Sequence, residues 1–167
     1  MYKVVEYKHL GGETHELVVE APQLAKKAKS GQFLIVRMDE GSERIPLTIA
    51  DNDPEKGTVT IVIQAIGHST KKIVAMREGD AFQDVVGPLG VASEIENYGT
   101  VVIVGGGVGI APIYPIARDL KKAGNHVIAI IGAKTKDLLF WEEKMAEAVD
   151  EVRIATDDGS VGHKGFV

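Results

Sequence analysis

The 167-residue sequence contains no cysteine. It can therefore form no disulfide, thiol nucleophile or cysteine-ligated iron–sulfur cluster from its own residues. It also lacks any apolar run approaching the roughly 20 residues that cross a bilayer. The N-terminus, Met1-Tyr2-Lys3, does not lead into the apolar core of a signal peptide. These absences predict a cytoplasmic protein with no membrane segment.

An excess of basic residues is absent as well. The formal net charge is −5, whereas a general nucleic-acid binder is usually basic, so no nucleic-acid partner is expected. Aromatic residues make up only 5% of the chain, but hydrophobic residues reach 44% and charged residues 26%, as in ordinary globular proteins. The length allows one domain or two small ones.

The first part of the chain has the pattern of a β-protein. Short β-branched or aromatic runs at 16–20, 32–37 and 58–63 are separated by turn residues such as Gly11-Gly12. This spacing predicts a small antiparallel β-barrel. A single helix is expected over 69–76, with Ser69 or Thr70 near its N-cap.

The pattern changes near residue 97, which predicts two domains, 1–97 and 98–167. The second alternates strands and helices, expected at 100–104, 110–123, 126–131, 137–149 (with Asp137 as N-cap) and 151–156. Alternation of this kind with apolar strands predicts a parallel βαβαβ sheet, incomplete because it has only half the usual elements of a nucleotide-binding sheet. Such a half-sheet would expose an apolar face and an open edge. We expect a partner or, in preference, the rest of a longer chain to cover it.

The most informative motif follows the first of these strands. Four glycines fall within five residues at 105–109, between an apolar strand and a helical pattern. A strand that turns through glycines into a helix presents free backbone N–H groups, which suit a phosphate and hence a nucleotide. The spacing is neither the dinucleotide fingerprint G-x-G-x-x-G nor a Walker A loop, and no acidic residue closes the second strand. A tight turn without a ligand remains the alternative.

Read in order, the motifs of the whole chain resemble the ferredoxin–NADP reductase superfamily, and within it the electron-transfer subunits. They are Gly31-Gln32-Phe33, Arg44-Ile45-Pro46-Leu47-Thr48, Gly67-His68-Ser69-Thr70, Gly87-Pro88-Leu89-Gly90, the run from Gly105 to Pro112, and Thr156-Asp157-Asp158-Gly159-Ser160. The resemblance implies an FAD-binding antiparallel β-barrel followed by an α/β domain that binds NAD(P)H.

The resemblance also implies roles for individual residues. Thr48 occupies the position beside flavin N5, where its hydroxyl or backbone N–H can hydrogen-bond the atom that accepts hydride. The other flavin-binding positions are Arg44, Ile45, Pro46 and Leu47 along the strand and Gly67, Ser69 and Thr70 at the flavin pyrophosphate. The positions implied for the nicotinamide nucleotide are Gly105, Gly106, Gly107, Val108 and Gly109 under its pyrophosphate, Ala111 and Pro112 at the helix start, and the acidic pair Asp157 and Asp158. No metal-ligating residues are expected.

The sequence departs from the family pattern in its strand motif and in its lack of cysteine. The motif's arginine position holds Ile45, and Arg44 stands one residue early, which on a strand turns its side chain to the opposite face. Leu47 replaces the usual aromatic residue. Relatives also carry a cysteine-rich C-terminal segment that holds a [2Fe–2S] cluster, so in this protein a cluster would lie only in a missing C-terminal segment, if at all.

The function implied is flavin-dependent electron transfer. Hydride would pass between NAD(P)H and FAD N5, and single electrons would go on to a larger iron–sulfur or flavoprotein subunit or a ferredoxin-like acceptor. Two alternatives remain: a non-catalytic FAD- and nucleotide-binding subunit that docks a larger partner, and a nucleotide sensor without flavin. The choice between NAD and NADP stays open, since Lys134 and Lys136 could contact a 2′-phosphate.

Overall fold

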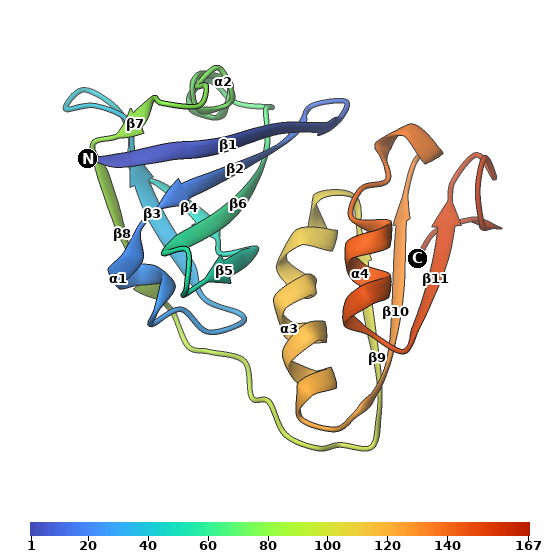
Figure 1. Cartoon of the computed structure of the whole chain (residues 1–167). Coiled ribbons are helices and arrows are strands. Elements are labelled where there is room, and N and C mark those ends of the chain that lie inside the picture. The colour runs from blue at the N-terminus through green and yellow to red at the C-terminus, as the bar shows by residue number, and fades with distance from the viewer. The chain divides into compact units, whose positions relative to one another are not determined.

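A computed structural model describes all 167 residues, which form two compact units (Figure 1). The first unit comprises Met1–His9 and Glu13–Ala92, and the second comprises Leu10–Gly12 and Ser93–Val167. The first unit is antiparallel β-structure and the second is a parallel α/β sheet. The predicted fold class is therefore confirmed, while the division of cofactors between the two domains remains a prediction.

The first unit contains two antiparallel sheets with a barrel-like arrangement. One sheet has the strand order β5-β6-β2-β1-β7 and the other β4-β3-β8. The strands are β1 (Tyr2–Gly11), β2 (Thr14–Glu20), β3 (Phe33–Arg37), β4 (Ile45–Thr48), β5 (Asp51–Asp53), β6 (Thr58–Gln64), β7 (Ala81–Phe82) and β8 (Asp84–Leu89). Two short helices, α1 (Pro22–Ala25) and α2 (His68–Val74), complete the unit.

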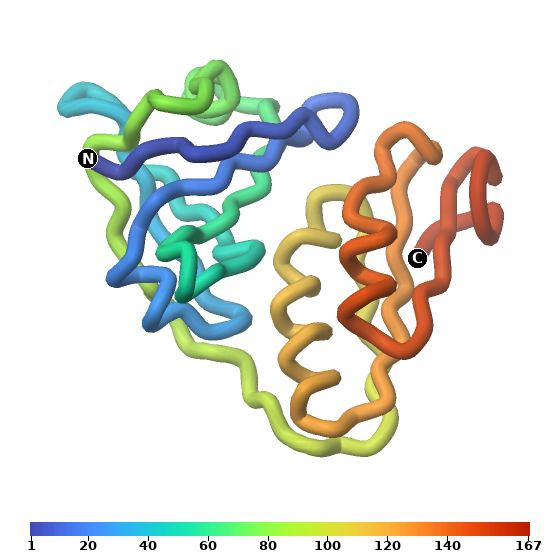
Figure 2. Tube along the Cα trace, in the orientation of Figure 1, coloured from blue at the N-terminus to red at the C-terminus, as the bar shows by residue number.

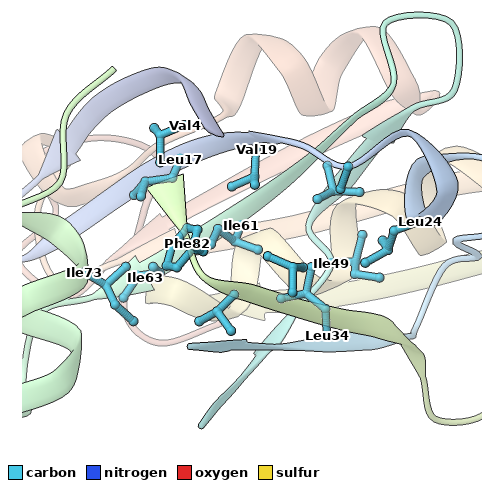
Figure 3. Close-up of a cluster of buried hydrophobic side chains, with 14 of the residues drawn as sticks. Val4, Leu17, Val19, Leu24, Leu34, Ile49, Ile61, Ile63, Ile73 and Phe82 are labelled. Carbon is cyan, nitrogen blue, oxygen red and sulfur yellow. The ribbon is translucent and has the colours of Figure 1, made fainter. Parts of the chain in front are cut away.

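The core of the first unit follows from the two-residue period of its strands. Leu17 and Val19 of β2 alternate inward, as do Ile61 and Ile63 of β6, and all four are buried. They pack with Phe82 of β7, which has no exposed surface (Figure 3). The same cluster includes Leu34 and Val36 of β3 and Ile73 of α2, so the core joins both sheets of the first unit and helix α2.

Helix α2 begins one residue earlier than predicted, and its N-cap is different. Gly67, rather than Ser69 or Thr70, is the N-cap residue. Thr70 lies three positions further on, where its hydroxyl accepts a 2.9 Å hydrogen bond from the Gly67 N–H and donates a 3.0 Å bond to the Gly67 carbonyl. Glycine is tolerated at an N-cap, and the threonine supplies the capping interaction from inside the helix.

The second unit is a parallel sheet with the strand order β12-β11-β10-β9. Its strands are β9 (Thr100–Gly106), β10 (His126–Ala133), β11 (Glu151–Thr156) and β12 (His163–Lys164). The helices are α3 (Ile110–Lys122) and α4 (Glu142–Ala148), with 3₁₀ turns at Gly107–Gly109 and Lys136–Leu138. The trace in Figure 2 shows β9, β10 and β11 running side by side.

Both helices of the second unit cover the same face of its sheet (Figure 1). On that face Val127, Ala129 and Ile131 of β10 are completely buried. On the opposite face Val102 and Val104 of β9 are 54% and 49% exposed. The predicted exposed apolar face is thus confirmed, and β9 forms an open edge of the sheet.

The predicted helix over 137–149 is wrong in its first part. Asp137 lies in the 3₁₀ turn, and α4 starts only at Glu142, after Trp141. Trp141 has a left-handed backbone (φ 58°), which interrupts the helical path. The centroid of its ring lies 5.3 Å from the centroid of the Tyr114 ring, and the Lys144 Nζ atom lies 4.0 Å from the Trp141 ring centroid.

No helix of the chain combines the length and apolarity needed to cross a membrane.

Candidate functional site

The glycine run connects β9 to α3 as a 3₁₀ turn. Gly107 has a left-handed φ of +54°, a conformation that other residues adopt only at a cost. A Cβ atom at Gly107 or at Gly109 would meet no atom within 4 Å, so the backbone there is open on its outer side. Backbone N–H groups at the start of the 13-residue helix α3 follow directly. The turn therefore leaves room and backbone donors for an anionic group, and its binding of a nucleotide diphosphate stays a prediction.

Gly105 has a different role from Gly107 and Gly109. A Cβ at position 105 would lie 2.7 Å from Ile113 Cδ1 and 2.8 Å from the carbonyl oxygen of Gly109. The missing side chain therefore allows α3 to pack closely on β9. Ala111 and Pro112 lie in the first turn of α3, where proline's missing N–H leaves no helical hydrogen bond unmade.

A cavity of about 230 Å³ lies beside the glycine turn, at the carboxyl ends of the parallel strands. It is lined by Gly106 of β9 and Gly107 of the 3₁₀ turn, by Lys134 from the segment after β10, and by Asp157 from the segment after β11. Ligands of open α/β sheets bind in this position. The structure thus brings Asp157 and Lys134 to one cavity with the glycine turn. The last residues of the chain, Gly165–Val167, also line it.

The two aspartates after β11 differ in their surroundings. The Asp158 carboxylate accepts hydrogen bonds from the Ser160 hydroxyl (2.6 Å) and the Ser160 N–H (2.9 Å), and these bonds hold the pKa of Asp158 below its usual value. The Ser160 hydroxyl also accepts a 2.8 Å bond from the N–H of Lys136, which ties this turn to the segment after β10. Asp158 therefore stabilises the loop, and Asp157 faces the cavity.

A second cavity, of about 250 Å³, lies within the first unit between the β3–β4 segment and α2. Ile45 of β4 and Ser69 of α2, both predicted flavin-binding residues, line it together. Arg44 precedes β4 and is exposed, whereas Thr48 pairs with Phe33 of β3 and is partly buried. Neither Arg44 nor Thr48 lines this cavity, and the same is true of Pro46, Leu47, Gly67 and Thr70.

Two charged residues of this cavity were missed by the sequence reasoning. Lys72 lies three residues after Ser69, a spacing that places both on one side of a helix and gives a usable signal. Glu43 stands just before the strand motif, and its carboxylate accepts a hydrogen bond from the Ser69 hydroxyl. This contact joins residues 26 positions apart, so no local pattern could have indicated it.

An antiparallel, barrel-like unit followed by a parallel sheet with a glycine turn defines the ferredoxin-reductase class of folds. Phthalate dioxygenase reductase has this fold: at 18% identity its structure superposes with a TM-score of 0.80 over 95% of this chain and 51% of its own. Over 165 residues the chain is 46% identical to the dihydroorotate dehydrogenase B (NAD(+)), electron transfer subunit homolog of Thermotoga maritima, covering 99% of this chain and 58% of the relative.

Two further relatives point the same way. The dihydroorotate dehydrogenase B (NAD(+)), electron transfer subunit of Bacillus cereus is 38% identical over 170 residues, covering 98% of this chain and 65% of the relative. The structure of an NADH-dependent reduced ferredoxin–NADP oxidoreductase, from work on flavin-based electron bifurcation, is 44% identical with a TM-score of 0.93, covering 99% of this chain and 59% of that one.

These matches confirm the predicted resemblance to the ferredoxin–NADP reductase superfamily and to its electron-transfer subunits. The chain spans about 58% to 65% of the length of these curated relatives. No protein-family model matches it.

Proposed function

We propose that this chain is the flavin- and nicotinamide-binding part of a cytoplasmic electron-transfer subunit. The observation that carries the proposal is the open glycine turn beside Asp157, in a chain similar along 99% of its length to electron-transfer subunits. A bound flavin would supply the chemistry, accepting hydride from a nicotinamide and releasing electrons singly. The acceptor is a larger iron–sulfur or flavoprotein subunit or a ferredoxin-like protein, and any [2Fe–2S] cluster lies outside residues 1–167.

The chain's own residues would bind and orient the two cofactors rather than perform acid–base chemistry. The flavin would be held by the β4 segment and by the Gly67–Thr70 segment of the first unit. Of the residues proposed to hold it, Ile45 and Ser69 line a cavity between these two segments, which offers an apolar and a hydroxyl contact. The nicotinamide nucleotide would be held by residues 105–112 and by Asp157. Holding two reacting rings in near-attack geometry accounts for most of the acceleration.

The simplest test of the proposal is the colour of the purified protein. A yellow protein with flavin absorbance that bleaches anaerobically with NADH is the expected result. Flavin absorbance without bleaching would favour the non-catalytic binding subunit, for which the bare apolar face of Val102 and Val104 offers a docking surface. Nucleotide binding by a chain that takes up no flavin would favour the nucleotide sensor.

Thr48→Ala is expected to slow flavin reduction by NADH about tenfold, the value of one lost hydrogen bond of ordinary strength. FAD affinity should change less than about threefold, because the proposed contact is with the reacting atom alone. Stopped-flow bleaching and a flavin titration measure the two quantities. Thr48→Ser keeps the hydroxyl and serves as the control; equal slowing in both variants would argue against the hydroxyl, and unchanged bleaching in Thr48→Ala would remove the role altogether.

We propose NADH as the preferred nucleotide. A carboxylate can accept a hydrogen bond from a ribose 2′-hydroxyl and repels a 2′-phosphate, and Asp157 lines the cavity that Gly107 also lines. The name of the Thermotoga relative specifies NAD(+), which supports the same choice. Lys134 lines the same cavity, and its positive charge would favour the 2′-phosphate of NADPH. Substitution of Asp157 therefore tests which of the two charges sets the preference.

Asp157→Asn is expected to raise the affinity for NADPH about tenfold while NADH affinity stays within about threefold, because the repulsion between like charges is removed. Titration of each nucleotide against the flavin-loaded protein gives the ratio. Asp158→Asn is the matched control, since Asp158 is engaged by Ser160, and it should leave the ratio within about twofold. An equal shift in both variants would contradict a specific role for Asp157.

A further inference from the structure

The cavity of the first unit is lined by both apolar and charged residues; the side of the lining that holds Glu43, Ser69 and Lys72 is called its rim. Val36, Met38, Ile45 and Ile73 form the apolar part. The rim includes Glu43 from the β3–β4 segment and Ser69 and Lys72 from α2. The lining thus combines the Glu43 carboxylate, the Lys72 ammonium group and the His68 imidazole with the serine residues Ser42 and Ser69. The cavity therefore offers both apolar and charged contacts to a ligand.

Ser69 is the residue of α2 that brings a hydroxyl to this cavity. The neighbouring hydroxyl, of Thr70, is held by the backbone of Gly67 through both of its hydrogen bonds and contributes to the helix start. The Ser69 hydroxyl instead donates to the Glu43 carboxylate across the cavity rim. The position in front of the Ser69 hydroxyl is therefore filled by an anion that belongs to the chain itself.

Glu43 is well suited to leave this position. Its side chain is exposed, so rotation into solvent would leave no buried charge without a partner. A phosphate oxygen offers the Ser69 hydroxyl the same kind of acceptor as a carboxylate oxygen. A phosphate and the carboxylate would repel one another if both remained at the rim.

We propose that Glu43 is an internal competitor for the cofactor: its carboxylate occupies the place beside Ser69 that a phosphate group of FAD takes, and FAD must displace it. This inference rests on the proposed flavin-binding function. Its consequence is that the residue lowers affinity for phosphate-bearing flavins while leaving the apolar part of the cavity unchanged. Glu43 is thus a specificity-determining residue, because its negative charge disfavours flavins that carry phosphate relative to flavins that do not.

The test compares flavins with and without phosphate. FAD and riboflavin are titrated into the full chain, and binding is followed by flavin fluorescence. Glu43→Gln is expected to tighten FAD binding about tenfold, whereas riboflavin affinity stays within about twofold, because riboflavin brings no phosphate to the rim. Glu40→Gln removes the same charge from the same segment at a residue that does not line the cavity, and it should leave both affinities unchanged.

A second variant tests whether the effect passes through Ser69. In a Ser69→Ala background, Glu43→Gln should tighten FAD binding less than about threefold, because the shared hydroxyl is gone. The proposal is overturned if Glu43→Gln weakens FAD binding or leaves it unchanged, if riboflavin gains as much as FAD, or if Glu40→Gln has the same effect. If neither the wild type nor any variant binds FAD, the proposed function itself is overturned. That outcome differs from FAD binding whose affinity does not depend on Glu43, which would overturn only this inference.

Discussion

Gly107→Val is expected to lower the affinity for NADH by a factor of about 100 or more. Two causes combine: valine, a β-branched residue, is strained at a φ of +54°, and its side chain would fill the open space over the turn. The proposed diphosphate needs that space in order to reach the backbone N–H groups. Isothermal titration of NADH against the flavin-loaded protein measures the loss.

The matched control for this substitution is Gly99→Val. Gly99 also has a left-handed backbone (φ +90°), a Cβ atom there would meet no atom within 4 Å, and the residue lies in the same unit just before β9. The two variants should lose similar stability, about 1–2 kcal/mol, because the backbone strain is of the same kind. NADH affinity should fall only in Gly107→Val. Equal losses of affinity in the two variants would mean that the glycine turn does not hold the nucleotide.

Gly105→Ala is expected to reduce the free energy of unfolding by about 1–3 kcal/mol, the usual range of overpacking and backbone displacement in a tight contact. The new methyl group would be 2.8 Å from the Gly109 carbonyl oxygen and 2.7 Å from Ile113 Cδ1. The carbonyl belongs to the backbone and cannot rotate away, so α3 must shift from β9. Urea unfolding followed by circular dichroism gives the difference.

Two variants define the cause of this loss. Gly109→Ala adds the same methyl group in open space at a helical φ of −64°, so the free energy of unfolding should stay within about 0.5 kcal/mol of the wild type. Gly105→Ala combined with Ile113→Val removes the Cδ1 contact but keeps the carbonyl contact, and should recover only part of the stability. A Gly105→Ala protein as stable as Gly109→Ala would show that the strand–helix contact is not tight.

The elements that could be predicted are those whose pattern is local. The apolar runs of β9, β10 and β11 have the composition of buried parallel strands, and the periodicity of α3 marks its length within one residue. Strands β4, β5 and β7 have only two to four residues, too few for a period to appear. The start of α4 depends on Trp141, whose left-handed backbone is accompanied by packing against Tyr114, a residue remote in sequence.

The sequence motifs predict which residues belong to the candidate site, but they do not predict the different roles of neighbouring residues within it. The glycine run reads as one phosphate-binding unit, whereas Gly105 packs against α3 and Gly107 faces open space. Asp157 and Asp158 are likewise equivalent in the sequence, and only the position of Ser160 separates them. Glu43 was missed because its contact with Ser69 depends on the tertiary structure.

The bare face of the parallel sheet has a thermodynamic consequence. The heat-capacity increment of unfolding comes from apolar surface that water reaches only when the chain unfolds. Val102 and Val104 are already about half exposed in the folded chain, so they add correspondingly little to that increment. The burial that stabilises the second unit therefore lies mainly on the helix-covered face of its sheet. Its free energy of unfolding should vary less steeply with temperature than that of a sheet buried on both sides.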